Sequence, residues 1–147
     1  LKDTYEQIRL KMITLGLIHC DETGSCVDGK TCWVHVASDQ NYTYLTINQK
    51  SGQAGMDAAN VLPHANGIIM HDCWNSYWKY QNVTHAICCA HLLRELNGVI
   101  ENHPEQTWAV RFKKLLLDMK KVRDKALLLD KDEVSYYHRH KFDLQTV

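Results

Sequence analysis

The chain has 147 residues, of which 45% are hydrophobic and 23% are charged. This length suits one domain with a buried core, and the composition is close to that of ordinary globular domains, so intrinsic disorder is excluded. The apolar runs are far shorter than the ~18 residues of a membrane span, and residues 1–11 lack the regions of a secretory signal. Because the sequence begins with Leu1 rather than Met, we expect it to be part of a longer protein.

Six cysteines raise the question of disulfides or a zinc site. A chain of this length without a secretory context does not need disulfides, so we expect reduced thiols. The first four cysteines contain no Cys-x-x-Cys pair, which argues against a conventional zinc module. We interpret these four as core residues: Cys20, Cys26, Cys32 and Cys73.

The net charge of zero conceals an asymmetry along the chain. Residues 1–110 contain 7 Lys and Arg against 11 Asp and Glu, a net charge of −4, whereas residues 111–147 contain 10 against 6, a net charge of +4. A basic C-terminal part can follow a phosphate backbone, but a solvated helix face gives the same pattern. Charge alone therefore does not establish DNA binding.

The first part of the chain predicts three antiparallel strands. After an entering helix at residues 1–12, an apolar run at 16–21 leads toward Asp28-Gly29, which is a strong hairpin signal. The segments 31–37 and 42–47 are rich in strand-forming residues and are separated by a polar turn. We expect these strands to form a meander.

The next part predicts a helix, two strands and two further helices. Residues 53–62 suit a helix that ends at Pro63, and the apolar run at 67–72 predicts a buried strand of a parallel sheet. Residues 83–88 predict a fifth strand, and helical spacing begins at Ala90. This order is that of an α/β fold with a ribonuclease-H-like mixed five-stranded sheet and flanking helices. We place this core at residues 1–104, followed at 105–147 by the start of a helical insertion.

That insertion is expected to begin with a long amphipathic helix. From Glu105, apolar residues hold one stripe over about six turns at 3.6 residues per turn. The stripe consists of Trp108, Phe112, Leu115, Met119, Val122, Ala126 and Leu129.

Two carboxylates stand out, because Asp21 and Asp72 each close an apolar run that predicts a core strand. A charge at such a place is costly unless it is paired or binds a metal. If the first and fourth strands are parallel neighbours, both side chains project from one edge of the sheet, and Mg²⁺ prefers oxygen ligands of this kind. Aspartates at strand ends also open turns or cap helices, and the pattern alone leaves that alternative open.

Four motifs in order resemble the insertion sequence 66 family of bacterial transposases. The resemblance covers residues 16 to about 119, most of the chain. The last motif is the most specific, because a Cys and a His three residues apart are followed by Arg-Glu-Leu. The motifs are Ile-His-Cys-Asp-Glu-Thr-Gly at 18–24, Trp-Val-His-Val at 33–36, His-Asp-Cys-Trp-Asn-Ser-Tyr at 71–77 and His-Ala-Ile-Cys-Cys-Ala-His-Leu-Leu-Arg-Glu-Leu at 85–96.

The resemblance implies a DDE-type DNA transposase in which Asp21 and Asp72 are the first two catalytic carboxylates and bind Mg²⁺ or Mn²⁺. Such enzymes use two metal ions about 3.5–4 Å apart to cleave the transposon end and to join its 3′-hydroxyl to target DNA. The resemblance also implies transposon-end and target DNA as partners and a homo-oligomer of the full-length protein. A bacterial cytoplasmic, nucleoid-associated location without membrane contact is expected.

The third carboxylate of the family resembles a Glu in an Asn-Asn-x-x-Glu-Arg segment, which does not occur in these 147 residues. We therefore expect the chain to be inactive alone. Glu95, four residues after His91, is a less favoured candidate for the third carboxylate than for a surface or Arg94-paired role. Two positions depart from the family, with Cys73 where Gly is common and Cys89 where Asn is common.

Cys88 and His91 form a Cys-x-x-His pair that several DDE families show, sometimes as half of a zinc site. No second half is evident, because alternation along a strand places His85 and Cys88 on opposite faces, so a structural role at the strand-to-helix junction is favoured. His19, His35 and His71 have no pattern that assigns a role.

Four aromatic residues follow Asp72, and at least two of them are expected in the core, with stacking on DNA bases as the alternative. They are Trp74, Tyr77, Trp78 and Tyr80. Two other functions stay open for the chain as a whole: a metal-dependent nuclease or resolvase of the same fold, and a non-catalytic remnant that acts as a DNA-binding or assembly module.

Overall fold

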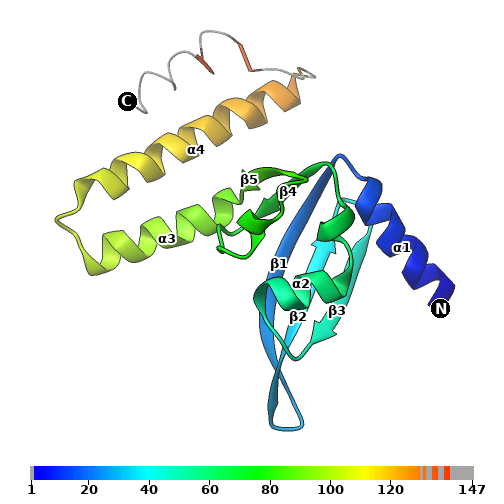
Figure 1. Cartoon of the computed structure of the whole chain (residues 1–147). Helices are drawn as coiled ribbons and strands as arrows, with labels where there is room; N and C mark the ends of the chain where they lie inside the picture. The colour runs from blue at the N-terminus through cyan, green and yellow to red at the C-terminus, as the bar shows by residue number, and fades with distance from the viewer. Residues whose placement is uncertain (1, 130, 132–133, 136–137, 140–147) are drawn as a thin grey trace. The chain divides into compact units, whose positions relative to one another are not determined.

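The structure is a computed structural model that describes residues 2–129, 131, 134–135 and 138–139. By packing, the chain divides into two compact units, with the boundary between Cys88 and Cys89. The first unit contains the sheet, and the second contains two long helices (Figure 1).

A five-stranded mixed sheet forms the first unit. Its strands are β1 (Leu17–Val27), β2 (Lys30–Ser38), β3 (Thr43–Asn48), β4 (Ile68–His71) and β5 (Thr84–Ile87). They lie in the order β3-β2-β1-β4-β5. The first three are antiparallel neighbours, and β4 and β5 run parallel to β1. This arrangement confirms the expected α/β, ribonuclease-H-like sheet, including the parallel pairing of the first and fourth strands.

The strand β1 is longer than the sequence predicted. It continues from Asp21 to Val27 and turns at Asp28-Gly29, whose φ angles of 51° and 74° are those that a two-residue hairpin turn requires. Pairing with β2 is continuous from His19 to Val27, and the hairpin extends beyond the rest of the sheet in Figure 1. Asp21 therefore lies inside a strand, not at its end as expected, because the hairpin pairing carries β1 past the apolar run.

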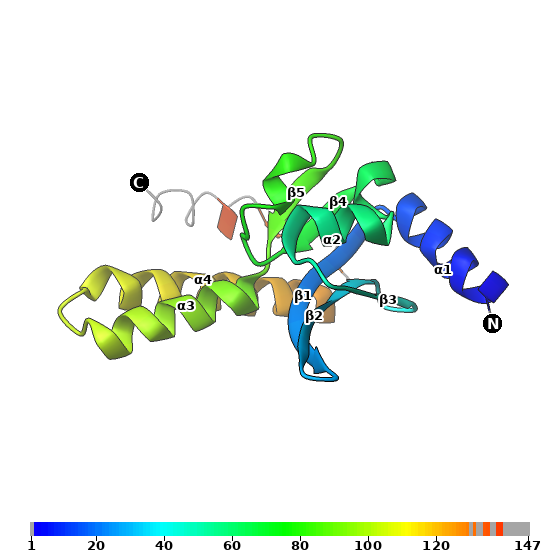
Figure 2. The ribbon, with the colours of Figure 1, turned by 60° about the horizontal axis from the view of Figure 1, so that its bottom comes forward.

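Two helices cover one face of the sheet. They are α1 (Lys2–Thr14) and α2 (Gly52–Ala59), and the short 3₁₀ turns η1 (Leu62–His64) and η2 (Tyr77–Lys79) lie in the loops around β4. Helix α2 packs on β2 and β3, and it lies over the sheet in both ribbon views (Figure 2). It ends at Asn60, where φ is 56°, earlier than the predicted residue 62. The core between these layers contains Met12, Ile18, Cys20, Ala37, Tyr44, Met56, Val61, Leu62, Ile69, Tyr77 and Tyr80.

The second unit is a helical hairpin of α3 (Cys89–Asn102) and α4 (Thr107–Leu128), which pack against each other. The Lys113 ammonium donates to Asn97 Oδ1 at 2.7 Å and links the two helices. By packing, α3 belongs with α4, whereas the boundary predicted at residue 104 assigns it to the catalytic core. Among the described helices, none has the length and apolar character needed to cross a membrane.

Lysines on α4 form ion pairs within their own helix. Lys114 lies 2.6 Å from Asp118, and Lys120 pairs with Asp124. Such exposed pairs contribute little to stability, yet they neutralise part of the basic excess of this region. The described part of the basic region thus has the properties of a solvated helix face.

All six cysteines are unbridged in the structure, and their reduced state stays a prediction. The interpretation of the first four as core residues is right for buried Cys20 but wrong for Cys26 and Cys73, which are exposed, and Cys32 is half-buried. Cys26 points to the same side of β1 as Cys20 does, but it lies in the hairpin from Thr23 to Val27, where every β1 residue is exposed.

Candidate active site

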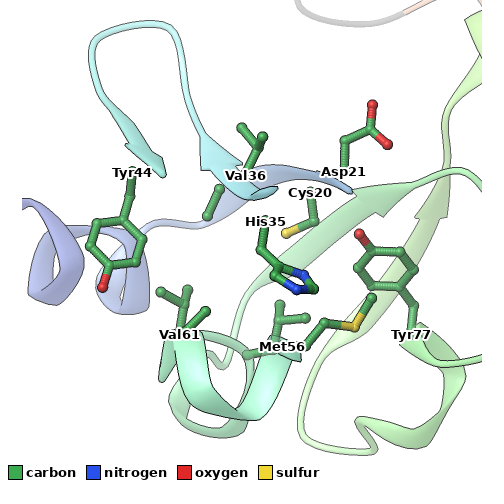
Figure 3. A pocket seen from close by; sticks show the side chains of 11 residues that line it. Cys20, Asp21, His35, Val36, Tyr44, Met56, Val61 and Tyr77 are labelled. Carbon is green, nitrogen blue, oxygen red and sulfur yellow. The ribbon is translucent and has the colours of Figure 1, made fainter. Parts of the chain in front are cut away.

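Strand β1 presents its residues alternately to the two faces of the sheet. Ile18 and Cys20 are buried on the face that α2 covers, at 2% and 7% exposure, whereas Asp21 is exposed. In Figure 3 the Asp21 carboxylate points away from Cys20 and His35, which lie on the side of α2. Asp21 is therefore an accessible carboxylate on the far face of a strand whose other face is core.

Asp72 directly follows β4, the parallel neighbour of β1, at the level of Asp21. The parallel register of β1 and β4 ends with the pair His19 and Met70, and each aspartate comes two residues after its member of that pair. Because side chains two residues apart share a face, both aspartates belong to the face of His19 and Met70. The topology therefore brings both predicted residues to one face at the carboxyl end of β4.

Each carboxylate accepts a hydrogen bond from a nearby backbone N–H. The Glu22 N–H donates to Asp21 Oδ1 at 2.9 Å, and the Trp74 N–H donates to Asp72 Oδ1 at 3.0 Å. Hydrogen bonds of this kind orient carboxylates that ligate a metal. The two acidic groups are thus held in defined directions by their own chain.

The pKa of the Tyr77 hydroxyl is raised in this structure. Burial, and then the negative charge of the groups around it, raises the pKa of Tyr77 above its usual value. The groups that act on it are, in decreasing order, Cys20, Asp72, Glu22 and Asp21. Because its pKa is raised, this hydroxyl stays protonated.

The two aspartates offer oxygen donors of the kind that a hard divalent cation prefers. Mg²⁺ keeps several water ligands and is commonly bound through one or two carboxylates. Within the residues that the structure describes, no group of three or more His, Cys, Asp or Glu side chains is placed to hold a metal ion. A second ion would therefore need a further ligand.

The accessory candidates divide between the two units. Cys88 ends the first unit, is half-buried, and donates its N–H to the His71 carbonyl at 2.8 Å. In β5, His85 pairs with buried Ile69, which places His85 on the core face. On α3, in the second unit, His91 is half-buried and Glu95 is exposed. Zinc binding by Cys88 and His91 and a ligand role for Glu95 remain predictions.

The aromatic residues after Asp72 separate as expected into core and surface. Tyr77 and Tyr80 are buried, at 2% and 5% exposure, whereas Trp74 and Trp78 are 45% and 42% exposed. At least two of the four therefore belong to the core, and Trp74 presents accessible indole next to Asp72.

A small cavity lies under β1 on the core face (Figure 3). Its volume is about 20 Å³, which is room for about one water molecule, and side chains that line it include Cys20, His35, Met56 and Tyr77. A space of this size does not admit a nucleotide.

Glu22 was not recognised as a supporting residue from the sequence, and its side chain is only 3% exposed. Its Oε2 accepts the Gly52 N–H at 3.0 Å and lies 3.3 Å from His35 Nδ1, while Oε1 is buried without a hydrogen-bond partner among the described atoms. The available signal was its position next to Asp21, since alternation must turn it toward the core.

His71, next to Asp72, had no role assigned from the sequence, and its side chain is only 1% exposed. Its Nε2 lies 3.0 Å from His85 Nδ1. Burial, and then the neighbouring His85, lowers the pKa of His71, while Asp72 raises it by less. Buried His71 and half-buried His85 thus lie on the core face next to the second aspartate.

The match to one family model defines the class of protein, which is a transposase. The model of the transposase IS66 family matches residues 1–146, and the chain belongs to that family. No curated protein matches the chain.

Several solved structures are similar to this chain. The trimeric form of the HTLV-2 integrase catalytic core domain in complex with magnesium has 13% sequence identity, with 60% of this chain and 73% of that chain covered and a TM-score of 0.41. Its dimeric form has 13% identity, with 66% and 81% covered and a TM-score of 0.41. The simian T-cell lymphotropic virus intasome in complex with the PP2A regulatory subunit B56 gamma has 12% identity, with 60% and 42% covered and a TM-score of 0.42.

Proposed function

We propose that this chain carries the first two metal-binding carboxylates of a DDE-type transposase, Asp21 and Asp72. The observation that carries the proposal is the parallel register of β1 and β4, which places both aspartates at one level on one face. Membership in the transposase IS66 family supports it. The substrates are transposon-end and target DNA, and the full-length protein works as a homo-oligomer in the bacterial cytoplasm.

The chain's own residues bind and orient in this scheme. Bound Mg²⁺ or Mn²⁺ ions supply activation of the attacking oxygen and stabilisation of the leaving oxygen of the phosphodiester. Asp21 and Asp72 offer carboxylate oxygens whose directions are set by the Glu22 and Trp74 N–H groups. Neither aspartate acts as a nucleophile, because the attacking oxygen belongs to water or to a DNA 3′-hydroxyl.

We further propose that the 147-residue chain binds one metal ion firmly and does not catalyse strand transfer by itself. With two carboxylates, a second ion is held loosely, so the attacking and leaving oxygens are not stabilised together. Nicking of a DNA duplex bearing the element's ends by this chain in Mn²⁺, abolished by Glu95→Gln, would show instead that Glu95 completes the site.

Metal binding tests the role of the two aspartates directly. The 147-residue chain is titrated with Mn²⁺, and the free ion is followed by its electron paramagnetic resonance signal. We expect Asp21→Asn and Asp72→Asn each to lower the Mn²⁺ affinity at least about 10-fold, because even changes in the outer shell of a metal site cause a loss of this size. Asp28→Asn is the matched control, because Asn-Gly also suits the hairpin turn. Wild-type affinity in either the Asp21→Asn or the Asp72→Asn variant would contradict the proposal.

A further inference from the structure

We propose that His71 and His85 form a fixed hydrogen-bond relay that positions Asp72. This inference rests on the proposed metal-binding role of Asp72. In it, the histidines are positioning residues that act through the backbone of the turn after β4, without contact to metal or DNA.

The direction of the relay follows from its two ends. His85 Nε2 lies 3.1 Å from the Tyr80 carbonyl oxygen, which can only accept, so Nε2 carries a proton. At the other end, the Cys73 N–H donates to His71 Nδ1 at 3.2 Å, so that nitrogen carries none. A neutral His71 then has its proton on Nε2 and donates it to His85 Nδ1 at 3.0 Å.

Both ends require the same pair of ring tautomers. All three hydrogen bonds run from Cys73 through His71 and His85 to Tyr80, with each ring neutral and protonated on Nε2. If His71 carried its proton on Nδ1 instead, two N–H groups would face each other at Cys73, and the bond to His85 Nδ1 would lose its donor. His85 therefore fixes which nitrogen of His71 accepts from the turn.

Aromatic packing prevents the rings from turning. His71 stacks on Tyr77 with ring centroids 4.5 Å apart and an interplanar angle of 21°. Trp78 meets the edge of His71 at 5.2 Å and lies against His85 at 4.6 Å. The Trp78 indole N–H also donates to the Cys73 carbonyl at 3.3 Å, so the Cys73 residue is held at both its N–H and its C=O.

This fixation acts on Asp72 because Asp72 stands between His71 and Cys73. The chain turns sharply at Cys73, whose φ of 74° is rarely adopted by residues other than glycine. The bond from the Cys73 N–H to His71 ties the peptide that follows Asp72 to the strand residue that precedes it. The relay thereby sets the direction in which the Asp72 carboxylate leaves the sheet.

Two substitutions of His71 separate positioning from packing. In His71→Asn, the amide oxygen can take the place of Nδ1 and accept from Cys73, whereas in His71→Gln the amide group reaches the place of Nε2 and leaves the Cys73 N–H without its acceptor. We expect the 147-residue chain to bind Mn²⁺ about as well with Asn as with His at residue 71, and about 10-fold or more weakly with Gln. His103→Gln, at an exposed residue just after α3, is the matched control and should leave the affinity unchanged.

The far end of the relay gives an independent pair of variants, should His71→Gln fail to fold. His85→Asn supplies an oxygen for the His71 N–H and should bind Mn²⁺ about as well as the unaltered chain, whereas His85→Phe should weaken binding. Long-range ¹H–¹⁵N correlation spectra should also show both rings of the unaltered chain as neutral Nε2–H tautomers.

The outcomes distinguish this inference from the proposed function. Mn²⁺ affinity that survives His71→Gln and His85→Phe but is lost in Asp72→Asn overturns the relay and leaves the metal site in place. Equal losses in His71→Asn and His71→Gln, or an Nδ1–H tautomer at His71, also overturn the relay. Affinity that survives Asp72→Asn overturns the metal site itself.

Discussion

Replacing Cys73 with glycine should stabilise the protein. Cys73 has a φ of 74°, a left-handed conformation that costs a residue with a Cβ atom about 1–2 kcal/mol. Its side chain is exposed, so the loss of the thiol removes little buried surface. Glycine loses more conformational freedom on folding, at a cost of about 0.5–1 kcal/mol. The difference predicts a gain of about 0.5–1 kcal/mol in the free energy of unfolding.

Urea unfolding under reducing conditions, followed by circular dichroism, measures this gain. The matched control is Cys26→Gly, because Cys26 is also exposed but lies in the paired part of β1, where glycine weakens a strand. We expect the control to lose about 0.5–1 kcal/mol, which is the opposite sign. If Cys73→Gly destabilises the chain as much as Cys26→Gly does, the turn after Asp72 is not strained and the reasoning is refuted.

Three further predictions concern the core and its titrating groups. Ile69→Ala, at a residue with 0% exposure, should lower the free energy of unfolding by about 2–5 kcal/mol in urea titrations, and Ile68→Ala, at 40% exposure, by much less. Tyr80→Phe removes the 2.7 Å hydrogen bond to Asp57 and should lower the free energy of unfolding by about 1 kcal/mol in the same assay. Burial, and then the charge of Asp21, raises the pKa of the Cys20 thiol from 9.0 to about 12, so its contribution to stability is complete below pH 9 and is lost as the pH rises toward 12. Unfolding measured from pH 7 to 11 should show a smaller alkaline loss in Cys20→Ala, and an unchanged profile would contradict this.

The strands and their order were predictable because the signals are local. Apolar runs and the Asp28-Gly29 turn predicted the meander, and the closing positions of two runs made Asp21 and Asp72 the candidate carboxylates. The extension of β1 to Val27 was not predictable from apolar content, because residues Thr23 to Val27 are all exposed. That part of the strand is held by the turn and by cross-strand pairing with β2.

The residues that support the site were not predictable, because their partners are distant in the sequence. Glu22 bonds to Gly52, 30 residues away, and His71 bonds to His85, 14 residues away. Neither bond leaves a pattern in the local sequence, and only the fold brings the groups together. Side-chain alternation shows which residues face the core but not which polar group each one meets there.

The same alternation links the exposure of each aspartate to the burial of its neighbour. A strand that turns Asp21 to the open face must turn Glu22 to the core, and one that leads to Asp72 must bury His71. A buried polar group is costly unless it is hydrogen-bonded, so each neighbour needs partners on the core face, which are Gly52 for Glu22 and His85 for His71. The backbone N–H of Glu22 in turn orients Asp21, and the ring of His71 holds the turn after Asp72. At both aspartates, the next or preceding residue along the strand thus has a buried polar side chain with a partner on the core face, and the same residue also holds the chain at the carboxylate.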